Sequence, residues 1–69
     1  MELIKYLKAN YSDVRVIGVK NPSVIVNHNG VTYIIYRACY SAKKANYVIC
    51  KGLDRFYFDR MSETKRYIK

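Results

Sequence analysis

Residues 23–40 read SVIVNHNGVTYIIYRACY, and this stretch decides the fold. Asn29-Gly30 stands between two runs rich in β-branched residues. This dipeptide favours the type I′ turn of a two-residue β-hairpin, in which both loop residues need a positive φ. The pattern therefore predicts strands over 23–27 and 31–40, joined by a loop of Asn29 and Gly30.

The same turn predicts which side chains share a face of the sheet. With two loop residues, His28 opposes Val31, and successive side chains along each strand alternate between faces. One predicted face carries Val24, Val26, Val31, Tyr33, Ile35, Arg37 and Cys39; the other carries Ile25, Asn27, Thr32, Ile34, Tyr36, Ala38 and Tyr40. We expect the first face to be the core face, covered by an N-terminal helix.

The remaining elements are predicted from periodicity and turn residues. Leu3, Ile4 and Leu7 have the spacing of one apolar helical face, which indicates a helix over 2–10. Ser62 is a candidate cap for a final helical turn. Three further strands are expected at 14–20, 46–51 and 55–58.

The predicted fold class is α+β, with residues 1–69 forming a single domain. An N-terminal helix packs on a curled, barrel-like antiparallel sheet of about five short strands, and a short helical turn ends the chain. The second hairpin face mixes tyrosines and isoleucines with polar residues, so it is neither clearly buried nor clearly solvated. Either the sheet curls enough to bury both faces in part, or one face is an interaction surface.

Motifs for catalysis or cofactor binding are lacking in the sequence. His28 is the single histidine, and we expect it to be exposed beside the hairpin turn. Asp54 and Asp59 lie next to arginines, which indicates charge compensation rather than paired acid–base chemistry. Cys39 and Cys50 fit no metal-ligand spacing, and we expect two small buried or half-buried thiols, with a disulfide as the alternative. We predict no enzyme activity, no metal and no cofactor.

The sequence also bears on location. No apolar run approaches the roughly 18 residues of a membrane span, and the N-terminus does not resemble a signal peptide. A cytoplasmic protein is therefore expected.

The charge balance is the least ordinary property of the composition. Thirteen Lys and Arg against five Asp and Glu give a net charge of +8. Residues 1–42 carry five basic and two acidic groups, net +3, whereas 43–69 carry eight and three, net +5. Excess charge of one sign suggests a partner of the opposite sign. A basic domain without such a partner remains the alternative.

Basic and aromatic residues alternate from the end of the third predicted strand onwards. Cations neutralise phosphates and flat side chains stack on bases, so this mixture favours a nucleic acid, single-stranded or deformed, with low sequence specificity. The predicted contact residues are Tyr36, Tyr40, Lys43, Lys44, Lys51, Arg55 and Tyr57. Tyrosine is also a common strand and core residue, so each of these rings has core packing as its alternative.

Two other functions fit the same residues. The chain could be a small phage-encoded protein that inhibits or adapts a host protein or nucleoprotein assembly. Its basic surface suits an acidic protein surface, and tyrosine and arginine are enriched at interface hot spots. It could also form a homo-oligomer through Ile25, Ile34 and Tyr36.

Overall fold

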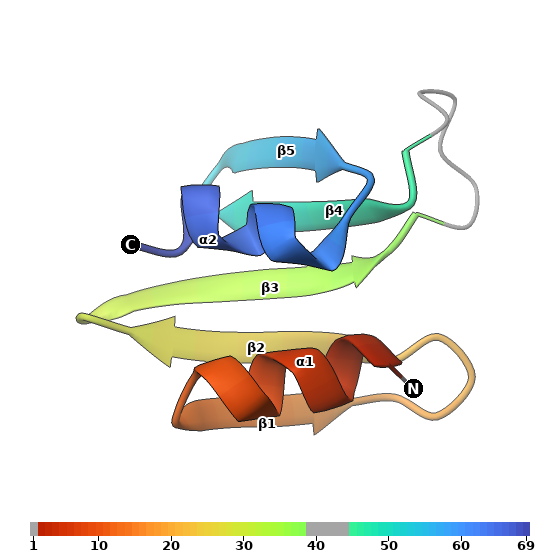
Figure 1. Cartoon of the computed structure of the whole chain (residues 1–69), viewed down its shortest axis with the longest axis horizontal. Coiled ribbons are helices and arrows are strands. Elements are labelled where there is room, and N and C mark those ends of the chain that lie inside the picture. The colour runs from red at the N-terminus through yellow and green to blue at the C-terminus, as the bar shows by residue number, and fades with distance from the viewer. Residues whose placement is uncertain (1, 39–44) are drawn as a thin grey trace.

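The computed structural model describes residues 2–38 and 45–69 of the chain. Over these ranges a five-stranded antiparallel sheet carries two helical segments on one face (Figure 1). The elements in chain order are α1 (Glu2–Asn10), β1 (Asp13–Ile17), β2 (Ser23–His28), β3 (Val31–Arg37), β4 (Tyr47–Lys51), β5 (Asp54–Phe58), the 3₁₀ turn η1 (Met61–Glu63) and α2 (Thr64–Tyr67).

The predicted N-terminal helix is confirmed. Leu3 and Leu7 of α1 are fully buried against the sheet, while Lys5 and Lys8 face solvent. A helix of nine residues is too short to be stable alone, so this packing must hold it. Its last turn ends where the Asn10 side chain donates a hydrogen bond to the Tyr6 carbonyl at 2.7 Å.

The central hairpin also has the predicted register. Asn29 has φ of 52° and Gly30 has φ of 77°, as a type I′ turn requires. His28 pairs with Val31 across this turn, and the pairs farther from it follow in step. The division of side chains between the two faces of β2 and β3 is therefore the one that the turn predicts.

The first predicted strand is too long. β1 ends at Ile17 rather than at residue 20. Gly18 has φ of 93°, a left-handed conformation that takes the chain out of the extended ladder and into the loop before Pro22. At the other end of the central hairpin, β3 ends at Arg37, and the predicted residues 39–40 lie outside the described part of the chain.

The predicted barrel-like closure is wrong. Among the described residues, each strand pairs only with its neighbours in the chain, in the order β1-β2-β3-β4-β5, so β1 and β5 are edges of an open sheet. After β5 the chain turns onto the face that already carries α1 (Figure 1). The two helical segments thus cover the core, and strand closure is not needed to bury it. We call this side of the sheet the covered face.

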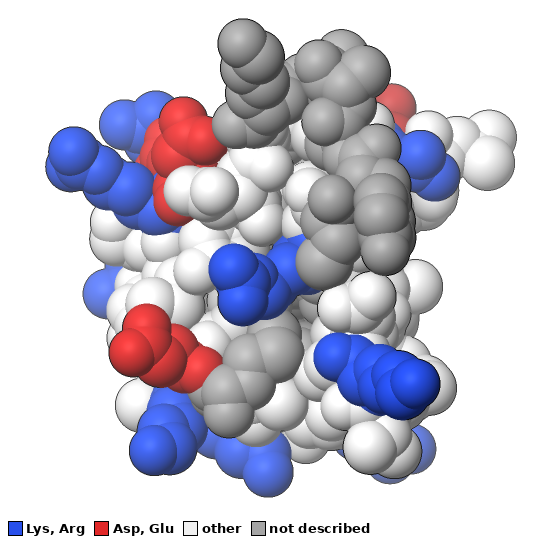
Figure 2. Space-filling view, turned by 90° about the vertical axis from the view of Figure 1, so that its right-hand side faces the viewer, with Lys and Arg blue, Asp and Glu red and all other residues white. Residues whose placement is uncertain are grey.

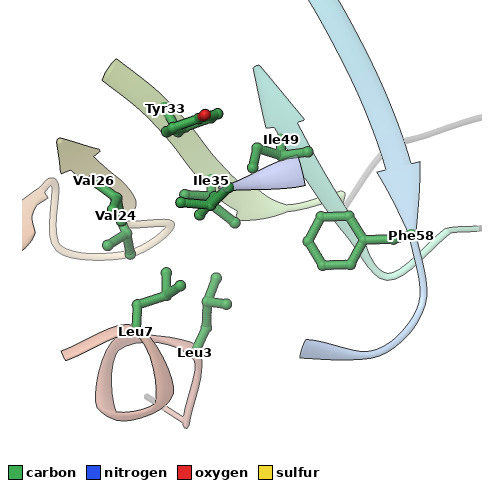
Figure 3. Packing of buried hydrophobic residues seen from close by; sticks show 9 residues of the cluster. Leu3, Leu7, Val24, Val26, Tyr33, Ile35, Ile49 and Phe58 are labelled. Atoms are coloured by element: carbon green, nitrogen blue, oxygen red, sulfur yellow. The ribbon is translucent and has the colours of Figure 1, made fainter. Parts of the chain in front are cut away.

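The core lies between the covered face and the two helical segments. Figure 3 shows side chains from β2, β3, β4 and β5 that point toward the two leucines of α1. The buried cluster consists of Leu3, Leu7, Val24, Val26, Tyr33, Ile35, Ile49, Phe58 and Ile68. Phe58 also packs against the rings of Tyr47 and Tyr67, with centroids 5.4 Å and 5.9 Å away.

A glutamate rather than the predicted Ser62 caps the C-terminal helical segment. The Glu63 carboxylate accepts hydrogen bonds from the backbone N–H groups of Asp59, at 3.0 Å, and Arg60, at 2.8 Å. These bonds, first that of Arg60 and then that of Asp59, lower the Glu63 pKa, and the nearby guanidinium of Arg66 acts in the same direction. Ser62 lies inside the turn, where it cannot serve as the N-cap.

Within the described ranges, no helix is long and apolar enough to cross a lipid bilayer.

Two adjacent isoleucines provide a test of the face assignment. Ile35 is 0% exposed in the core, whereas Ile34, on the other face, is 39% exposed. We expect Ile35→Ala to cost about 2–5 kcal/mol, because it leaves a cavity among buried side chains. The matched Ile34→Ala should cost less than half as much. Urea denaturation of both variants measures the difference, and equal losses would contradict the assignment.

The Glu63 cap predicts a pH-dependent contribution to stability. Because the folded-state pKa is lowered, the stabilisation is present above the ordinary glutamate pKa and is lost as the pH falls through the lowered value. Glu63→Gln should therefore melt at a lower temperature than the wild type at pH 7, and the difference should vanish in strong acid. Thermal melts by circular dichroism across this range test it, with Glu2→Gln as control. A difference that does not depend on pH would rule out this role.

Candidate binding face

The side of the sheet opposite the helices is an open face, and in the described part of the chain no helix covers it (Figure 1). Strand register and alternation place its side chains there. They are Asp13, Arg15, Ile17, Ser23, Ile25, Asn27, Thr32, Ile34, Tyr36, Val48, Cys50, Arg55 and Tyr57.

One row of this face crosses all five strands. Its successive cross-strand partners are Arg15, Ile25, Ile34, Cys50 and Arg55. Aliphatic side chains and a thiol thus form the centre of the row, and an arginine ends it at each edge of the sheet. A moderately apolar centre with charged groups at its margins is the usual composition of a protein interface.

The neighbouring row holds two tyrosines. Tyr36 on β3 and Tyr57 on β5 lie on either side of Val48, which pairs with both. Val48 is only 2% exposed although it lies on the open face, so its neighbours cover it. The two tyrosine positions are two strand spacings apart, about 10 Å.

Arg55 connects the two rows. Hydrogen-bonding interactions with the side chains of Tyr57, which contributes most, and of Cys50 raise the pKa of its guanidinium. Burial raises the pKa of the Tyr36 hydroxyl, and the nearby Cys50 adds to this effect. The cluster therefore places a guanidinium beside two tyrosine rings.

The structure brings together three of the seven predicted contact residues: Tyr36, Arg55 and Tyr57. Lys51 is not with them, because its cross-strand partners are Tyr33 and Asp54 on the covered side of the sheet. The other three predicted contacts, Tyr40, Lys43 and Lys44, lie outside the described residues.

Within residues 2–38 and 45–69, the positive charge is spread over the surface rather than concentrated beside Tyr36 and Tyr57. Figure 2 shows one end of the molecule, where lysine and arginine side chains are scattered among uncharged residues, some with acidic neighbours. Of the described basic residues after position 42, only Arg55 belongs to the open face. Four others, namely Arg60, Lys65, Arg66 and Lys69, belong to the segment that follows β5.

A shallow hollow of about 740 Å³ lies between the β2–β3 and β4–β5 turns. It adjoins the cluster of Tyr36, Cys50, Arg55 and Tyr57. Ile34 and Cys50 of the open face line it, as do Lys51 and Asp54 of the covered side. Leu53 of the second turn also lines it and is fully exposed. The hollow was not foreseen from the sequence, because it arises only when the meander brings two distant turns to the same end of the sheet. The signal that points to it is the pair of turn sequences at Asn29-Gly30 and Gly52-Leu53.

Residues considered for catalysis do not converge. In the described ranges no three His, Cys, Asp or Glu side chains gather as a metal-ligand set. The expected exposure of His28 is wrong, because its ring is half-buried edge-on to Tyr11, with centroids 5.3 Å apart. Cys50 is a half-buried free thiol, as expected, whereas Cys39 lies outside the described residues.

Comparison with known proteins finds no matching family model, no matching curated protein and no matching solved structure.

Proposed function

We propose that this chain is a non-enzymatic binding module that holds single-stranded nucleic acid, with low sequence specificity, on the open face of its sheet. The observation that carries the proposal is the cluster of Tyr36, Arg55 and Tyr57. Open antiparallel sheets that present aromatic rings are common platforms for unpaired bases. A duplex hides the faces of its bases, so a stacking surface favours a single strand.

The geometry supports a division of labour within the cluster. The two tyrosine rings offer stacking surfaces, and the Arg55 guanidinium offers a planar cation for a phosphate between them. The side chains of Tyr57 and Cys50 interact with this guanidinium, which places its charge next to the stacking surfaces.

The spread of charge makes stacking the main source of affinity. Arg15 and Arg55 are the described cations of the open face, and Asp13 lies 3.9 Å from Arg15. A bound strand therefore meets few cations, to which Lys43 and Lys44 add if they take part as predicted. Each phosphate contact to a single strand contributes about −0.7 to the slope of log Kobs against log salt concentration.

Fluorescence anisotropy with labelled DNA and RNA oligonucleotides tests this function. Tyr36→Leu and Tyr57→Leu should each weaken binding roughly five- to hundredfold, because leucine preserves apolar contact but lacks a flat ring. The salt slope should lie between about −1 and −3. Arg55→Ala and the Lys43→Ala/Lys44→Ala double variant should each make it shallower.

Matched controls come from the other side of the molecule. Tyr6→Leu on α1 and Arg66→Ala on α2 make the same chemical changes away from the open face, and both should bind as the wild type does. Lack of binding at low salt would refute the function. Equal losses in the control variants would refute the location.

A protein partner is a second candidate, favoured by the aliphatic part of the open face. Ile17 is 57% exposed and Ile34 is 39% exposed, and stacking on bases needs neither. A partner with an apolar patch and acidic margins would fit this centre and its two arginines. An inhibitor or adaptor of a host protein, encoded by a phage, is the form of this function that we propose. Self-association through Ile25, Ile34 and Tyr36 would use the same surface.

Nuclease treatment separates the second candidate from the first. A stoichiometric protein that survives nuclease on the wild-type chain, and is lost from Ile34→Asp, would support a protein partner. Recovery of nothing but nucleic acid would refute it. Self-association through the face predicts that Ile34→Asp converts a larger species to one of 8.1 kDa in light scattering.

A further inference from the structure

The edge strand β1 combines an unpaired side with exposed side chains. In the described part of the chain, β2 is its one strand partner, and α1 lies over β1 and β2 on the covered face (Figure 1). Val16 is 38% exposed and Ile17 is 57% exposed. The side chains of Asp13 and Arg15 project from the open face, where they are 51% and 78% exposed. An edge of this kind can pair with another chain unless something prevents it.

The central turn determines which backbone groups of β1 point outward. His28 and Val31 close a two-residue hairpin, so they form a hydrogen-bonded pair, and such pairs alternate along an antiparallel ladder. Along β2, this alternation directs the N–H and C=O groups of Ile25 toward β1 rather than toward β3. Its partner Arg15 therefore bonds to β2, whereas the N–H and C=O groups of Val14 and Val16 point away from the sheet.

Two copies of β1 can pair antiparallel about a two-fold axis. Three registers of this pairing bring the outward groups of Val14 and Val16 opposite those of the second copy. An axis through Arg15 places Arg15 opposite Arg15 of the second copy, which is repulsive. An axis through Val16 places Arg15 opposite Ile17 of the second copy and leaves Asp13 without a charged partner. An axis through Val14 places Asp13 opposite Arg15 of the second copy, and the reverse pair forms by symmetry. The charges of β1 are thus self-complementary in one register.

We propose that β1 pairs antiparallel with β1 of a second copy about a two-fold axis through Val14. The two copies of Val14 exchange backbone hydrogen bonds at the axis, and two Asp13–Arg15 pairs flank it on the open face. Within one chain the same two groups are 3.9 Å apart and largely solvated, so both remain accessible to a second copy. The result is a ten-stranded sheet with all helices on one face and both open faces continuous.

Sedimentation equilibrium at 0.15 M salt tests the proposal. At this ionic strength the screening length is about 8 Å, so the repulsion between two chains of charge +8 is reduced while adjacent charges still interact. The wild type should form a species of twice 8.1 kDa as its concentration rises to the millimolar range. Asp13→Arg and Arg15→Asp should each raise the dimer Kd by about tenfold or more, because each places like charges opposite one another.

Two combinations should restore the dimer. The double variant Asp13→Arg/Arg15→Asp exchanges the charges and keeps the complementarity, so its Kd should lie within about threefold of the wild type. An equal mixture of the two single variants should form a heterodimer, because one copy then carries both positive charges and the other both negative ones. Lys20→Asp and Asp54→Arg make the same changes in charge outside the register and should leave the dimer intact.

A backbone variant tests the edge itself. Val14→Pro removes an outward N–H group without removing a bond between β1 and β2, and it should abolish the dimer. Circular dichroism shows whether this variant is folded. If it is not, the single and double charge variants of Asp13 and Arg15 test the proposal by themselves. A wild-type chain that stays monomeric at millimolar concentration would overturn the proposal. So would a dimer that survives both single reversals, or one that Ile34→Asp disrupts.

Discussion

The left-handed backbone of Asn29 and Gly30 is the constraint on which the rest of this structure depends. It makes the central hairpin close on a two-residue loop, and this loop determines which residues of β2 and β3 face each other. A shift of one residue would exchange the faces, moving Ile35 out of the core and Ile34 into it. Both the helix-covered core and the open face therefore follow from one turn.

Local signals predicted the parts of the fold that local geometry controls. The helix over 2–10 and the central register follow from residue spacing and from Asn29-Gly30. The barrel-like closure was wrong because it depends on where residues 59–69 go after β5, and no short-range pattern encodes that path. The end of β1 depends on the φ of Gly18. Glycine also occurs inside strands, so its presence in the sequence does not mark where a strand ends.

The candidate site was predictable in the same partial way. Tyr36 was assigned to the second hairpin face by alternation alone, and Tyr57 was selected as one of the aromatic residues that alternate with basic ones. Lys51 was grouped with them because it is close in sequence to Tyr47 and Arg55. Closeness in sequence does not determine which face of the sheet a side chain occupies. Of the eight tyrosines, Tyr36 and Tyr57 lie on the open face, and Tyr40 is outside the described residues. The other five belong to the core or pack against it, namely Tyr6, Tyr11, Tyr33, Tyr47 and Tyr67.

The meander has a consequence for the order of folding. Each strand pairs with the next one in the chain, so each hairpin closes a short loop at low entropic cost. Contacts of the C-terminal segment close much longer loops, as in the hydrogen bond that the Asn29 side chain donates to the Lys69 carbonyl, 40 residues away. We therefore expect the hairpins to form in the transition state for folding, and the C-terminal segment to dock after it.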